Sequence, residues 1–200
     1  ILAKILVPET EEPKTKNTTD IQIEQTASNV VEAAANGASE GLGLALNVAA
    51  MLLAFVALIA LLNYILAAIG GLFGFPTLSF QWILGKIFSP LTFAMGIPTS
   101  DISTAGSLLG QKIMINEFVA YSELSKFIAA GTLQPKTILI LTYALCGFAN
   151  ISSVAIQIGG IGALAPDKKG VIAKLGFKAL LGGALATCLT GTIAGVLFSM

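Results

Sequence analysis

The sequence has 200 residues, of which 55% are hydrophobic and 11% are charged. Soluble domains carry about 25% charged residues, so this deficit indicates a membrane protein. The chain has no histidine and no net charge, which excludes histidine-based catalysis, histidine metal ligands and a basic surface for nucleic acid. Cys146 and Cys188 lie in apolar surroundings, and we interpret them as small buried hydrophobic residues rather than a disulfide or metal pair.

The first third of the chain is expected to be helical around one polar loop. Residues 1–20 resemble the end of a preceding transmembrane helix and a proline-broken loop, as in a segment of a longer protein. Residues 21–40 predict an amphipathic helix in the membrane interface, with a soluble connecting helix as the alternative. Residues 41–73 carry no charge and exceed the roughly 20 apolar residues that a bilayer requires, so they predict a transmembrane scaffold helix. Its Asn47 and Asn63 are expected to join helices or mark helix ends.

Two further helices are expected on either side of the polar centre of the sequence. Residues 78–95 are aromatic and contain Pro90, which favours a short interfacial helix over a sharply kinked spanning helix. Residues 168–200 predict the final transmembrane helix, and its basic start places the preceding loop in the cytoplasm and the C-terminus outside. Its glycines should let neighbouring helices approach closely, namely Gly182, Gly183, Gly191 and Gly195.

The segments between them are too short or too polar to be simple spans. Residues 101–131 predict a re-entrant hairpin of two short helices, the first capped by Ser100 or Asp101. Its arms reach about 21 Å, which is less than a hydrocarbon core of about 30 Å. Residues 136–165 predict a transmembrane helix broken near Asn150. Irregular backbone at this depth is tolerated only where protein buries it or it lines a watery cavity.

Glu117, at the expected hairpin tip, is the strongest single functional signal. An ionisable group at membrane depth costs at least about 2.5 kcal/mol and usually marks a substrate site or pathway. The alternative is a structural ion pair with Lys112 or Lys126. Asn150, beside serines such as Ser153, either binds a ligand or satisfies backbone groups freed by the break. Broken helices that meet a hairpin tip are typical of secondary transporters, so the predicted fold is an all-α membrane protein that forms half of an inverted-repeat transporter.

Several stretches together resemble one family. The run GQKIMINEFVAY at 110–121 fits the pattern G/A-x-K-x-x-x-N-E-F-V-A-Y/M/F of the concentrative nucleoside transporters. CGFANISS at 146–153, the downstream GGIGALAP and the upstream ASNVVEAAANGASEG resemble the same family, in the same order. The segment is therefore similar to the C-terminal half of such a transporter.

The resemblance implies a homotrimer in the cytoplasmic membrane, with a scaffold domain and a mobile transport domain. A sodium or proton gradient would drive nucleoside uptake, and no other cofactor is implied. Glu117, Asn150 and Ser153 would bind the ribose, and Phe148 would line the pocket. The base-binding hairpin and the sodium ligands would lie in the N-terminal half.

Two other functional classes follow from the same residues. The main alternative is a non-transporting membrane subunit in which Glu117 forms a buried ion pair. An intramembrane enzyme is the weaker one, because no nucleophile–base pair is visible and a Ser/His/Asp triad is impossible without histidine. We therefore expect no enzymatic activity.

Overall fold

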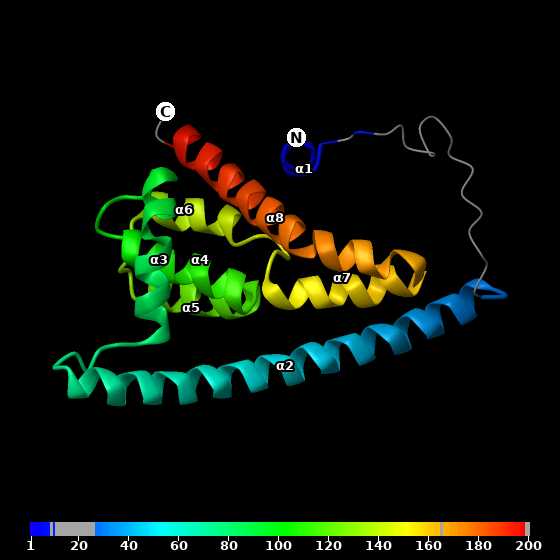
Figure 1. The fold of residues 1–200 in the computed structure, drawn as a ribbon, viewed down its shortest axis with the longest axis horizontal. Coiled ribbons are helices and arrows are strands. Elements are labelled where there is room, and N and C mark those ends of the chain that lie inside the picture. Colours follow the sequence, from blue (N-terminus) through cyan, green and yellow to red (C-terminus); the bar gives the residue numbers. More distant parts are fainter. Residues whose placement is uncertain (9, 11–26, 165, 199–200) are drawn as a thin grey trace. The chain divides into compact units, whose positions relative to one another are not determined.

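The protein is described by a computed structural model, which describes residues 1–8, 10, 27–164 and 166–198. Over these residues the chain is helical and contains no strand, in agreement with the predicted all-α class. The elements, in chain order, are α1 (Leu2–Leu6), α2 (Val30–Leu72), α3 (Phe80–Ala94), α4 (Ile102–Met114), α5 (Glu117–Ala129), α6 (Pro135–Ala144), α7 (Ile151–Leu164), the 3-10 turn η1 (Pro166–Lys168) and α8 (Lys169–Leu197) (Figure 1).

The chain divides into two units, one of residues Pro8–Leu61 and one of residues Ile1–Val7 and Leu62–Met200. In the smaller unit, the start of α2 is capped by Asn29, whose Oδ1 accepts the Glu32 N–H at 2.9 Å. The predicted boundary at residue 41 is wrong, since α2 continues through it without interruption. A glycine inside a helix costs only about 1 kcal/mol relative to alanine, which is too little to end so long a helix. The predicted start at residue 21 lies outside the described residues.

The end of α2, which belongs to the larger unit, is a glycine-rich turn. Gly74 has a φ of +74°, a conformation that glycine adopts readily. Asn63 then joins α2 to α3: its Nδ2 donates to Gln81 Oε1 at 2.9 Å, and its Oδ1 accepts the Phe80 N–H at 2.7 Å. The predicted helix-joining role is thus confirmed for Asn63, whereas the side chain of Asn47 is outside the described part.

Helix α3 runs without a break through Pro90 and packs closely on α4. A Cβ added to Gly106 would lie 2.7 Å from Gly85 O, and one added to Gly110 would lie 2.7 Å from Leu84 Cβ. Only glycine therefore fits these two positions of α4. The expected location of α3 in the membrane interface stays a prediction.

Helix α8 packs along both α6 and α7 (Figure 1). A Cβ on Gly191 would lie 2.6 Å from Ile140 O of α6, and one on Gly183 would lie 3.1 Å from Ala149 Cβ, so the expected close approach is confirmed there. Among the residues that the structure describes, α8 is the helix long and apolar enough to cross a membrane, and Val56–Leu72 is a shorter apolar helix. The transmembrane role of residues 41–73 stays a prediction.

Candidate substrate-binding site

Helices α4 and α5 form a helical hairpin whose tip is Ile115 and Asn116. Asn116 has extended backbone, and its Oδ1 accepts the Val119 N–H at 3.0 Å, so it caps α5. Glu117 is consequently the first residue of α5 and is half-buried. The partial positive charge of a helix N-terminus favours a carboxylate at this position. Re-entry of the hairpin into the membrane stays a prediction.

The predicted helix break is present and extends from Leu145 to Asn150, between α6 and α7. Asn150 caps α7: its Oδ1 accepts the Ser153 N–H at 2.8 Å, while Ser153 Oγ accepts the Asn150 N–H at 3.2 Å. This reciprocal pair resembles a capping box. Both residues are buried, with exposed fractions of 0% and 2%. The Asn150 oxygen thus satisfies backbone groups freed by the break, as one of the two sequence interpretations proposed.

The hairpin tip and the helix break meet at one hydrogen bond. Asn150 Nδ2 donates to Glu117 Oε2 at 3.1 Å. Because Glu117 begins α5 and Asn150 caps α7, the carboxylate lies beside the N-terminal ends of two helices. Both ends favour a negative charge, so this arrangement supports a carboxylate without a neighbouring cation.

The ion pair that the sequence offered as an alternative does not form. Lys126 Nζ bonds Glu123 Oε2 at 2.8 Å. Lys112 Nζ instead donates to Thr187 Oγ1 at 2.8 Å and to Ala144 O at 3.3 Å. Among the described residues, no lysine lies within salt-bridge distance of Glu117. The non-transporting subunit that depended on this pair is therefore not favoured.

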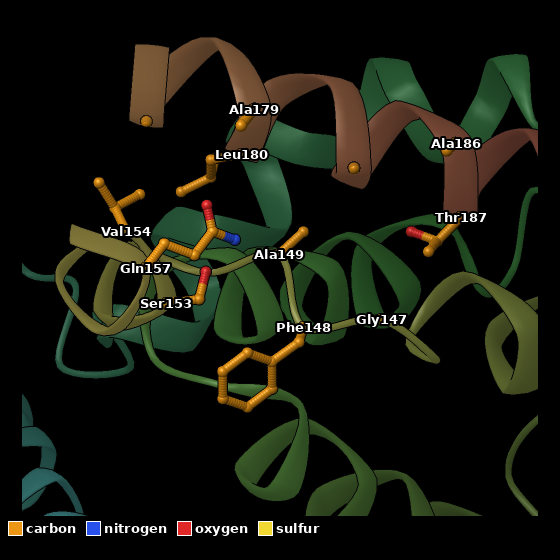
Figure 2. Close-up of a pocket in the computed structure, with 12 residues that line it drawn as sticks. Gly147, Phe148, Ala149, Ser153, Val154, Gln157, Ala179, Leu180, Ala186 and Thr187 are labelled. Carbon is orange, nitrogen blue, oxygen red and sulfur yellow. The ribbon is translucent and has the colours of Figure 1, made fainter. Parts of the chain in front are cut away.

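A cavity of about 320 Å³ lies between the break, α7 and α8 (Figure 2). Phe148 and Ser153 line it, whereas Glu117 and Asn150 are not among its lining residues. Figure 2 shows the Phe148 ring directed away from Leu180 of α8, and 53% of this residue is exposed. The structure thus joins Glu117, Asn150 and Ser153 through hydrogen bonds, whereas Phe148 shares the lining of the cavity with Ser153.

Two sequence interpretations near this site are corrected by the structure. Asp101 stands before α4, but its side chain makes no cap hydrogen bond there. Its Oδ2 accepts the Gln134 N–H at 2.9 Å and the Thr137 hydroxyl at 2.7 Å, so it serves the start of α6 instead. Cys146 is exposed rather than buried because it lies in the break, after α6 has ended.

Thr187 is a contact that the sequence did not indicate. It lies on α8, and its Oγ1 accepts from Lys112 Nζ while it donates to Ala184 O at 3.0 Å. A Cβ on Gly147 would lie 2.5 Å from Thr187 Cγ2, so α8 contacts the break directly. A threonine in an apolar helix carries no sequence signal for such a role. Thr187 is also far from the hairpin in the sequence, so the sequence does not indicate their contact.

Residues 1–195 match the family model described as "Na+ dependent nucleoside transporter C-terminus". The chain belongs to this family. Among relatives of the nucleoside transporter family, "Uncharacterized transporter YutK" of Bacillus subtilis is 49% identical over 197 residues, which cover 98% of this chain and 48% of the relative. "Nucleoside permease NupC" of Helicobacter pylori is 46% identical over 203 residues, which cover 100% of this chain and 48% of the relative.

Solved structures agree with this assignment. CNTnw in an inward-facing substrate-bound state is 47% identical and matches with a TM-score of 0.87, over 96% of this chain and 45% of that one. A CNTnw variant in an outward-facing state is 46% identical and matches with a TM-score of 0.92, over 99% and 47%. The chain therefore spans about half the length of the relatives that it matches. The family consists of transporters, so the expectation that the chain is not an enzyme is confirmed.

Proposed function

We propose that the chain is the C-terminal half of a sodium-coupled transporter that takes up nucleosides across the cytoplasmic membrane by alternating access. The family description names sodium and nucleosides, and the Helicobacter pylori relative is named a nucleoside permease. Inward-facing and outward-facing structures of CNTnw support alternating access. Sodium is therefore favoured over the proton as coupling ion.

The 3.1 Å hydrogen bond between Asn150 Nδ2 and Glu117 Oε2 is the observation that carries the proposal. An ionised carboxylate only accepts hydrogen bonds and accepts several at once, while ribose offers two adjacent hydroxyl donors. Asn150 Nδ2 keeps a second N–H, and Ser153 Oγ keeps one acceptor position after its bonds to Asn150. We assign these three residues to the ribose, with Phe148 lining the pocket.

The proposal also assigns the remaining parts of the chain. The hairpin of residues 101–131 re-enters the membrane, and it moves with the broken helix of residues 136–165 as the transport unit. Residues 41–73 belong to a static scaffold of a homotrimer, because they are apolar and unbroken. The base-binding groups and the sodium ligands belong to the part of the relatives that this chain does not cover.

A matched pair of substrates and variants tests the ribose assignment in the full-length protein. Glu117→Gln keeps the side-chain shape and loses the charge, so nucleoside affinity should fall about ten- to a hundredfold, as for one lost charged hydrogen bond of roughly 1.5–3 kcal/mol. The parent protein should bind a 3′-deoxynucleoside more weakly than the nucleoside itself. The Glu117→Gln variant should show a much smaller difference between the two, because its residue 117 already lacks the charge that strengthens the hydrogen bond to this hydroxyl.

Glu123→Gln is the control, since Glu123 lies on the same helix and pairs with Lys126. It should respond to the deoxynucleoside as the parent does. If the missing hydroxyl lowers nucleoside affinity by the same factor in Glu117→Gln and in the parent, Glu117 does not contact the sugar and the assignment is wrong.

A further inference from the structure

Lys112 is an ammonium group that the proposed ribose site does not use. Its side chain is completely buried, and buried lysines are almost always paired with an acid. Its hydrogen-bond partners are instead Ala144 O, at the end of α6, and Thr187 Oγ1 on α8. The ammonium therefore donates to a carbonyl at a helix end and to a hydroxyl. Glu117 interacts with it electrostatically, without a direct hydrogen bond.

The end of α6 shows what the ammonium does. The last four carbonyls of a helix have no partner inside the helix, and a helix that ends within a membrane cannot rely on water. The N–H groups of the break reach two of them: Leu145 donates to Leu141 O and Cys146 donates to Tyr143 O, at 2.9 and 3.2 Å. The other two are taken by hairpin side chains, Tyr121 Oη donating to Thr142 O at 2.7 Å and Lys112 Nζ to Ala144 O at 3.3 Å.

The charges on the hairpin also match the dipole of α6. Asp101 accepts hydrogen bonds at the N-terminal end of α6, where a negative charge is favoured, and Lys112 donates at the C-terminal end, where a positive charge is favoured. These residues are eleven positions apart, about 16 Å along α4, and the ten residues of α6 extend about 15 Å. The first arm of the hairpin therefore carries one charge for each end of α6.

In secondary transporters of this design, the C-terminal ends of broken helices are places where coupling cations bind. We propose that the Lys112 ammonium is a fixed cation that occupies such a place and binds the hairpin, the end of α6 and α8 together. Lys112 acts as a positioning residue: it holds the break so that Asn150 faces Glu117. This inference rests on the proposed nucleoside site, whose geometry it explains.

Charge and packing are separated by two variants of the full-length protein. Lys112→Met keeps most of the side-chain volume and loses the charge; nucleoside affinity should fall roughly tenfold or more at unchanged amounts of protein in the membrane, as for a lost hydrogen bond to a charged group. Lys112→Ala should show the same loss and should be partly restored by added propylammonium, but not by neutral propanol of the same chain length. Lys126→Met, an exposed lysine on the same hairpin, is the control and should keep parental affinity.

Each outcome decides the inference. Parental affinity in Lys112→Met, or equal restoration of Lys112→Ala by the amine and the alcohol, would show that only volume matters and would overturn it. If neither Lys112 variant reaches the membrane, Thr187→Val decides, because it removes the 2.8 Å acceptor and should weaken nucleoside affinity severalfold; unchanged affinity would contradict the inference. Nucleoside uptake by the parent protein in the same cells tests the proposed function separately. Failure of the proposed function can therefore be told apart from failure of the inference about Lys112.

Discussion

The charges of Glu117 and Lys112 each lie at a helix end that stabilises them. Glu117 lies at the start of α5 and beside the start of α7, and Lys112 lies at the end of α6. Neither uses the other as a direct partner. The chain thereby keeps an acid and a base on one hairpin without joining them in an ion pair.

Gly147 tests how closely the break depends on α8. A Cβ at this position would lie 2.5 Å from Thr187 Cγ2, so Gly147→Ala should displace the break. Overpacking of this kind costs about 1–3 kcal/mol, which should appear as lower thermal stability and weaker nucleoside binding. Gly170→Ala, whose Cβ would meet nothing within 4 Å, should change neither.

Thr187→Ser supplies the compensating change, since it deletes the methyl group and keeps the hydroxyl that Lys112 uses. The double variant Gly147→Ala with Thr187→Ser should recover most of the stability and binding. If the serine brings no recovery, the close contact between Gly147 and Thr187 is not the cause of the loss.

At the scale of the elements, the sequence was informative about which segments are short and polar. Residue patterns predicted the helical hairpin and a broken helix, because polar side chains at Asn116, Glu117 and Asn150 interrupt apolar runs. They did not predict that α6 ends at Ala144, before the chain reaches Asn150. That end depends on side chains from α4, α5 and α8, which only the folded chain brings there.

Asp101 shows the same limit at the other end of α6. A polar residue before a helix is normally taken as its cap, yet the carboxylate bonds Gln134 and Thr137, more than thirty positions away in the chain. The boundary predicted at residue 41 failed for a different reason: a glycine inside a helix costs only about 1 kcal/mol, so α2 continues through Gly41.

The link that Asp101 forms between the hairpin and α6 should depend on pH. Burial raises the pKa of Asp101, but hydrogen bonds from the Thr137 hydroxyl, the Gln134 N–H and the Ser100 hydroxyl outweigh burial and leave the pKa below its usual value. A lowered pKa in the folded state means that this carboxylate stabilises the protein above its unfolded pKa of about 3.9. The stabilisation is lost as the pH falls from about 4 through the lower, folded value.

Asp101→Asn should therefore lower the free energy of unfolding of the purified protein at pH 7 by about 1–3 kcal/mol. Its stability should also fall less between about pH 4 and lower pH than that of the parent. Thermal unfolding followed by circular dichroism measures both effects. Asp167→Asn, at an exposed position, should retain the parental pH profile; an Asp101→Asn profile as steep as the parental one would count against the link.

At the scale of the whole molecule, the chain covers 48% of the Bacillus subtilis and Helicobacter pylori relatives, and our proposal assigns it about half of a substrate site. It contributes one helical hairpin and one broken helix, with the carboxylate and amide that we assign to the ribose. Transporters built from inverted repeats form their substrate and ion sites between two such halves. Our proposal therefore assigns affinity for the base and coupling to sodium to groups outside these residues.

Residues 1–200 expressed alone should for this reason give no gradient-driven nucleoside uptake, even when the segment is inserted in the membrane. Co-expression with the N-terminal half of the same transporter should restore sodium-dependent uptake of labelled uridine. Restoration should disappear when the co-expressed segment carries Glu117→Gln and persist when it carries Glu123→Gln, because only the first residue is assigned to the sugar. Uptake by residues 1–200 without a second half would contradict the two-half site, since one hairpin and one broken helix would then suffice to bind and move the substrate.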